Sequence, residues 1–171
     1  MVLTRGRNAR RQAPGLSLGA SCGGFTLIEL LIVLSLIIII AAIAIPNWQR
    51  SRVTANEGAA IAALRSIASA QAQFQSEGII KYPSGMGRYA SLQQLGGTSP
   101  PLIDSVLATG IRQGYSFVTS PGGSDGAPTF TANADPVIMN SSGRRGFYVD
   151  ESAVIRFYSG GPAGAIDLPV Q

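Results

Sequence analysis

The fold of this chain is decided by residues 23–34, which read GGFTLIELLIVL and open an apolar run that continues to Ile45. Between Phe25 and Ile45 the only charged side chain is Glu29. At 1.5 Å per residue, a helix of these roughly 21 residues is about 31 Å long, which matches the hydrocarbon thickness of a bilayer. The run is rich in Ile and Val, but a lone strand in lipid would leave its backbone polar groups unpaired. We therefore expect residues 25–45 to form a transmembrane helix.

The segment before this run, residues 1–24, is basic. It carries Arg5, Arg7, Arg10 and Arg11 and no acidic residue. Without these four arginines, the 13 basic residues of the chain fall to nine, which equals the number of acidic residues, so the net charge of +4 belongs to this leader. A basic segment before an apolar helix is typical of a cytoplasmic N-terminus. The neutral remainder argues against a nucleic-acid-binding surface, which needs clustered Lys and Arg on the folded part.

Beyond Pro46 the pattern changes to that of an amphipathic helix over residues 46–78. Its apolar stripe has helical spacing and charged residues fall mostly elsewhere, while Gly78 is a stop signal. A proline inside a helix removes one hydrogen bond and crowds the preceding turn, so we expect a kink near Pro46. The alternative is that Pro46 ends the membrane span and a second helix starts at Asn47. The stripe consists of Val53, Ala60, Leu64, Ile67 and Phe74.

Residues 79–171 are expected to form a globular head. A connecting region over residues 79–112 holds two short helical stretches, and alternating apolar and polar residues then predict strands. We predict an α+β fold, in which the long N-terminal helix packs against a C-terminal antiparallel sheet of about four strands. The expected strands are 115–120, 129–134, 146–150 and 153–158, with a loop at 121–126, a hairpin turn at 151–152 and the end of regular structure at 160–162.

The stretch 23–30, together with the basic leader and Pro46, resembles the class III signal peptide of the type IV pilin superfamily, which includes the type II secretion pseudopilins. The specific resemblance covers about residues 23–54. It implies that a prepilin peptidase cuts after Gly24 and that Phe25 becomes an N-methylated N-terminus. It also implies that Glu29 meets the terminal amine of a neighbouring subunit, and that Pro46 marks the helix kink of that family.

The position of Glu29 within an apolar helix is unusual on physical grounds alone, apart from the resemblance. A charged side chain in an apolar helix costs on the order of 2.5 kcal/mol or more at the centre of a membrane. A cut after Gly24 would create an ammonium one helical turn before it, and an ammonium of one subunit paired with Glu29 of another would define the axial register of a filament. The alternative is that Glu29 is hydrogen-bonded at its own helix start or reaches the lipid headgroups.

The resulting functional prediction is a structural subunit of a bacterial surface filament. The resemblance implies a single-pass inner-membrane protein with a cytoplasmic N-terminus before assembly, and a place in a cell-surface pilus or periplasmic pseudopilus afterwards. Its expected partners are identical or related pilin subunits, prepilin peptidase and inner-membrane lipid. Two alternatives stay open: a pseudopilin of a type II secretion system, which the lack of cysteine after Cys22 favours somewhat, and an uncleaved membrane-anchored periplasmic binding domain.

Catalysis and cofactor binding have little support in the sequence. There is no histidine, and Cys22 lies in the leader, so we expect no enzyme activity, no cofactor and no metal. Asp150 and Glu151 are more simply a solvated turn than part of a cation site with Asp135 or Asp167.

Two smaller motifs have plain interpretations. Arg144-Arg145 is interpreted as surface charge. Ala20-Ser21-Cys22 resembles the end of a lipobox, but the hydrophobic run follows the cysteine instead of preceding it.

Overall fold

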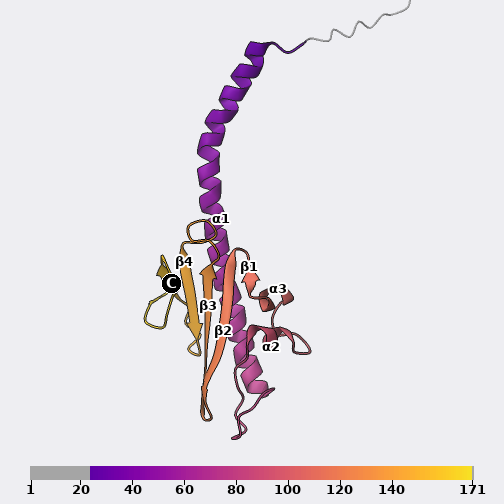
Figure 1. Ribbon diagram of the computed structural model, residues 1–171, viewed down its shortest axis with the longest axis vertical. Coiled ribbons are helices and arrows are strands. Elements are labelled where there is room, and N and C mark those ends of the chain that lie inside the picture. The colour runs from indigo at the N-terminus through magenta and orange to yellow at the C-terminus, as the bar shows by residue number, and fades with distance from the viewer. Residues whose placement is uncertain (1–23, 171) are drawn as a thin grey trace, which may run out of the picture. The chain divides into compact units, whose positions relative to one another are not determined.

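The computed structural model describes residues 24–170 and has an α+β fold, as expected (Figure 1). Six strands form one sheet, so the prediction of about four strands was too low. The helices are α1 (Leu27–Glu77), α2 (Leu92–Gly96) and α3 (Ser105–Ala108). The strands are β1 (Ile111–Arg112), β2 (Tyr115–Ser124), β3 (Ala127–Pro136), β4 (Arg145–Asp150), β5 (Arg156–Ser159) and β6 (Leu168–Pro169).

Helix α1 begins at Leu27, two residues after the predicted start at Phe25, and ends at the predicted stop before Gly78. The Thr26 hydroxyl accepts a hydrogen bond from the Glu29 backbone N–H at 3.2 Å, as an N-cap does. The helix ends before Gly78, whose φ of 60° lies in the left-handed region that glycine adopts at helix ends. The helix is continuous through Pro46, so no separate helix starts at Asn47. The kink assigned to Pro46 stays a prediction.

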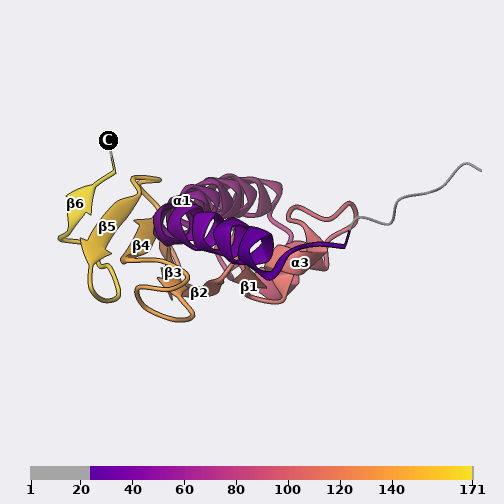
Figure 2. The ribbon, with the colours of Figure 1, turned by 90° about the horizontal axis from the view of Figure 1, so that it is seen from above.

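The sheet is an antiparallel meander in which every strand pairs with its neighbour in sequence. In the orthogonal view the strands follow one another from β1 to β6, with α3 near the β1 end (Figure 2). The loop predicted at 121–126 was wrong, because residues 121–124 continue β2 and pair with β3 as far as Ser124 opposite Ala127. Strand β1 covers only the start of β2, so Pro121 lies on an open edge, where proline is tolerated.

The C-terminal strands also differ from the prediction. β5 begins at Arg156 and not at residue 153, because residues 151–155 form a longer connection with Ala153 at a φ of 59°. β6 pairs with β5 beyond Gly160, where the sequence indicated the end of regular structure. β1 and β6 have two residues each, which is too short for an alternating pattern to be visible in the sequence.

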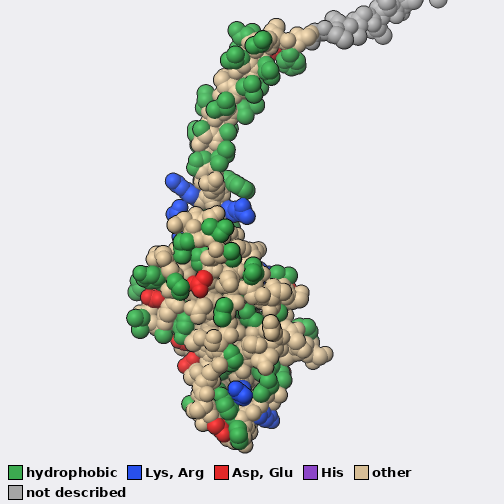
Figure 3. Space-filling view, in the orientation of Figure 1, with side chains coloured by type: hydrophobic (Ala, Val, Ile, Leu, Met, Phe, Trp, Pro, Cys, Tyr) green, Lys and Arg blue, Asp and Glu red, His purple; other side chains and the backbone are tan. Residues whose placement is uncertain are grey.

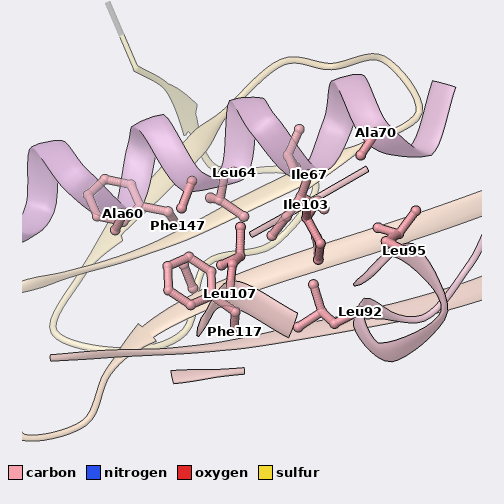
Figure 4. Close-up of a cluster of buried hydrophobic side chains, with 14 of the residues drawn as sticks. Ala60, Leu64, Ile67, Ala70, Leu92, Leu95, Ile103, Leu107, Phe117 and Phe147 are labelled. Atoms are coloured by element: carbon pink, nitrogen blue, oxygen red, sulfur yellow. The ribbon is translucent and has the colours of Figure 1, made fainter. Parts of the chain in front are cut away.

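The core lies between one face of α1 and the sheet, with α2 and α3 completing it (Figure 4). All residues of the predicted stripe are buried, which confirms that stripe as core packing. Burying an apolar side chain of this size stabilises the fold by about 1.5–3 kcal/mol. The core residues labelled in Figure 4 are Ala60, Leu64, Ile67 and Ala70 of α1, Leu92, Leu95, Ile103 and Leu107 around the short helices, and Phe117 and Phe147 of the sheet.

Candidate functional site

The apolar part of α1 before Pro46 has no cover within the chain. Phe25 is 82% exposed and Ile45 54%, and no residue from 24 to 45 is buried. Hydrophobic side chains fill the visible face of this segment (Figure 3). Within residues 24–170, α1 is the one helix long and apolar enough to cross a membrane. Soluble monomers rarely expose apolar patches larger than a few hundred Å², so this surface requires lipid or another protein.

The start of this segment is open to other molecules. Gly24 precedes α1 in an exposed stretch without regular secondary structure, and a Cβ added to it would meet no atom within 4 Å. Phe25 is exposed beside it. The rest of the predicted leader, including Cys22, lies outside the described residues.

Glu29 lies in the first turn of α1 and is exposed. Its backbone N–H is held by Thr26, but no residue from 24 to 170 donates a hydrogen bond to its carboxylate or forms an ion pair with it. A complete capping box would also have the Glu29 carboxylate accept a hydrogen bond from the Thr26 backbone N–H, and that bond is not formed. The carboxylate is thus available to a group of another molecule.

A buried ion pair fastens α1 to the sheet. Glu57 is only 7% exposed, and its Oε2 lies 2.8 Å from Nη2 and 2.9 Å from Nε of Arg145, the first residue of β4. Its Oε1 accepts a hydrogen bond from the Arg144 backbone N–H at 2.9 Å. The Arg145 guanidinium also lies over the rings of Phe147 and Phe157, at 5.4 and 5.2 Å from their centres. An ion pair, hydrogen bonds and cation–π contacts therefore together hold α1 to the start of β4.

The ion pair between Glu57 and Arg145 was not predicted from the sequence. Charged residues were expected to fall mostly away from the apolar stripe, yet Glu57 lies between Val53 and Ala60 at the same helical spacing and is buried with them. Arg144-Arg145 was interpreted as surface charge, which is right for Arg144 but wrong for Arg145. A lone acid in line with an apolar stripe is the signal that could have predicted a buried basic partner.

Two amide side chains add further links from α1 to the loops. Gln71 is completely buried, and its amide donates to the Ala90 carbonyl at 2.6 Å and accepts from the Ala90 N–H at 2.8 Å. Asn56 donates to the Ser142 carbonyl at 2.9 Å. Gln71, which is buried and paired with both polar backbone groups of Ala90, therefore favours one unique arrangement of α1 against this loop.

Two ionisable groups near β4 are perturbed by burial. Tyr115 is fully buried, its hydroxyl donates to the Arg145 carbonyl at 2.9 Å, and burial together with nearby Glu57 raises its pKa far above the ordinary value. Burial also raises the pKa of Asp135, whose Oδ1 has no hydrogen-bond partner among residues 24–170. Tyr115 therefore stays neutral, and Asp135 carries an uncompensated carboxylate.

Asp135→Asn is expected to stabilise the folded chain at pH 7. A raised folded-state pKa means that the ionised carboxylate lowers stability above that pKa and that this cost vanishes below the unfolded value of about 3.9. The variant should therefore melt at a higher temperature than the parent at pH 7, and the difference should shrink towards pH 4. Thermal unfolding followed by circular dichroism tests this, with exposed Glu151→Gln as the control. A variant that melts at or below the parent temperature at pH 7 would refute the assignment.

No group of three or more potential metal ligands occurs within residues 24–170, so Asp150, Glu151, Asp135 and Asp167 are not brought together as a cation site. Trp48 is 63% exposed on α1, two residues after Pro46.

Comparison with known proteins agrees with this geometry. Residues 19–45 match the family model described as the prokaryotic N-terminal methylation motif. The chain is 34% identical over 120 residues to the "Type IV wide pilus major component PilA4" of Thermus thermophilus, a match that covers 70% of this chain and 87% of that protein. No solved structure matches the chain.

Proposed function

The chain belongs to the type IV pilin superfamily, and from this premise we propose that it is a filament subunit that is cut after Gly24, N-methylated on Phe25 and assembled by the packing of its apolar helices. Residues 1–24 act as the leader, 25–45 as the membrane and filament-core segment, 46–78 as the amphipathic helix and 79–171 as the head. Its partners are prepilin peptidase, inner-membrane lipid and identical or related subunits.

The observation that carries the proposal is the uncovered apolar segment of α1 behind an accessible Gly24. We propose that two different environments bury this surface in turn. Lipid covers it while the subunit waits in the inner membrane, and the helices of neighbouring subunits cover it in the filament. Assembly moves the apolar helix from lipid to protein, and both environments are apolar. Assembly therefore depends on close helix packing and on polar pairing, and not on the hydrophobic effect alone.

Polar pairing is the role proposed for Glu29. Its carboxylate has no partner within the described chain, and a cut after Gly24 supplies an ammonium at Phe25. An ammonium and a carboxylate from different subunits neutralise each other only at one axial offset, so the pair selects the register. Contacts of this head-to-tail kind do not close on themselves and produce an open helical filament.

A type IV pilus is favoured over a type II secretion pseudopilus. The relative that matches across most of its length is named as the major component of a wide pilus.

The absence of cysteine after Cys22 excludes a disulfide in the processed chain, so its head is held together by packing and by the Glu57–Arg145 pair.

Processing is tested by the N-terminus of the protein made in cells that contain a prepilin peptidase. We expect intact mass and peptide sequencing to show a chain that begins at Phe25 with one added methyl group. Gly24→Val should block the cut and leave the leader in place, because a β-branched side chain directly before the cut bond crowds the approach of the peptidase. Gly58→Ala, at an open position within α1, is the matched control and should be cut normally. A parent chain that retains its leader would favour the uncleaved membrane-anchored alternative.

A further inference from the structure

A groove of about 430 Å³ lies where α1 emerges from the head. One wall is the α1 segment from Pro46 to Val53, and the other is the loop before β4, which contributes Asn140 and Arg144. Three arginines line it: Arg50 and Arg52 from the helix and Arg144 from the loop. Lys and Arg side chains gather on this part of α1 in the space-filling view (Figure 3).

None of the three arginine side chains has an ion-pair partner among residues 24–170. The ion pairs within residues 24–170 join Arg112 to Asp104 and Arg145 to Glu57, and none involves a groove arginine. The Arg52 guanidinium lies 5.9 Å from the centre of the Trp48 ring, which also lines the groove. Three like charges that line one hollow repel one another unless an anion joins them. Guanidinium groups suit a phosphate best, because their planar donors bind two of its oxygens at once.

The position of the groove identifies the source of the phosphate. Arg50 and Arg52 follow the end of the apolar run at Ile45 by about 7.5 and 10 Å along the helix. A headgroup layer is roughly 5–8 Å thick on each side of the hydrocarbon core. Side chains of a helix lean towards its N-terminus, so these arginines lean back towards the apolar segment. Trp48 between them and the apolar run is the residue type enriched at the membrane surface.

We propose that this groove binds the phosphate of an anionic membrane lipid, held by Arg50 and Arg52 of α1 and by Arg144 of the head. The inference rests on the proposed function, since it applies to the subunit while its apolar segment is in the membrane. Arg144 is the decisive residue, because it comes from the head and makes the lipid a bridge between the head and the membrane surface. Departure of the subunit into a filament would then require release of this lipid.

The test uses the full-length chain in an uncharged detergent and the fluorescence of Trp48, the single tryptophan of the protein. Short-chain phosphatidylglycerol, short-chain phosphatidylcholine and inorganic phosphate are titrated separately. We expect a saturable change with phosphatidylglycerol at a concentration at least tenfold lower than with the other two ligands. Arg144→Gln alone should weaken binding about tenfold, since a charge-assisted hydrogen bond to a phosphate is lost.

The combined variant Arg50→Gln, Arg52→Gln and Arg144→Gln should lose the saturable change. The matched control removes the same charge from exposed residues that do not line the groove, as Arg65→Gln, Lys81→Gln and Arg88→Gln, and should bind like the parent. Equal loss in both variants would reduce the effect to general electrostatic attraction and overturn the site.

Three other results would also overturn the proposal. Saturation by inorganic phosphate as readily as by the lipid would assign the groove to a free anion. A change that depends on protein concentration without lipid would assign it to a second copy of the chain. The absence of a saturable change with every ligand would show that the groove is not a binding site for any of them. None of these results depends on cleavage or assembly, so a chain that begins at Phe25 can still fail this test, and the two failures are distinguishable.

Discussion

Filament assembly is expected to fail when Glu29 is replaced by Gln. The variant keeps the size and the helix preference of the side chain but removes the charge that we propose neutralises the neighbouring N-terminal ammonium. A buried charge left without its partner costs about 3–5 kcal/mol. Since about 1.4 kcal/mol is tenfold in an equilibrium constant, each subunit addition should weaken by at least a hundredfold. The amount of filament sheared from cells, compared with the amount of subunit in the membrane fraction, measures this.

The control for Glu29→Gln is Glu77→Gln, which removes the same charge at the other end of α1 from an exposed residue. It should assemble normally. The Glu29 variant should still be cut to begin at Phe25, which separates an assembly defect from a processing defect. Normal filament yield from a correctly processed Glu29→Gln chain would remove the register role from this residue and favour the alternative that it is solvated near the membrane surface.

The head should lose much of its stability when Glu57 is replaced by Leu. The change strands the Arg145 guanidinium and the Arg144 N–H, which both point at the missing carboxylate. Breaking a buried ion pair costs about 3–5 kcal/mol, and because the Arg145 side chain retains 34% exposure we expect the lower end, about 3 kcal/mol. Urea unfolding of the full-length chain in detergent, followed by near-ultraviolet circular dichroism, measures the change in the free energy of unfolding.

A double variant distinguishes the ion pair from simple packing. Glu57→Leu with Arg145→Met removes both charges, so no charge is stranded, and it should recover part of the loss. Exposed Glu77→Gln should change the free energy of unfolding by less than about 0.5 kcal/mol. A single Glu57→Leu variant as stable as the parent, or a double variant less stable than the single one, would show that the pair does not fasten α1 to β4.

The parts of the fold that the sequence predicted are those encoded by neighbouring residues. The stripe of α1, its end at Gly78 and the helical turns after Ser91 and Asp104 depend on local spacing and local capping. The two-residue strands β1 and β6 carry no local pattern, because pairing with a neighbour creates them. The extension of β2 through Pro121 likewise follows from β3 and not from its own composition.

The polar residues of the stripe show the same limit in the candidate site. Glu57 and Gln71 share the helical spacing of their apolar neighbours, so that spacing could have predicted their burial. Their partners were not, because Arg145 and Ala90 are brought to them by the tertiary fold. The roles of Gly24, Phe25 and Glu29 depend on other molecules altogether, which is why a single chain leaves them as predictions.

We expect the apolar segment of α1 to be buried between subunits in the filament, and labelling of Ile37→Cys measures that burial. The chain has no cysteine after Cys22, so the introduced thiol is unique once the leader is removed. In filaments sheared from cells, a hydrophilic maleimide should fail to label Cys at position 37 until detergent and denaturant separate the subunits, whereas Ser124→Cys at the exposed end of β2 should be labelled at once. Rapid labelling at position 37 in intact filaments, or a chain found only in the membrane fraction, would contradict the account.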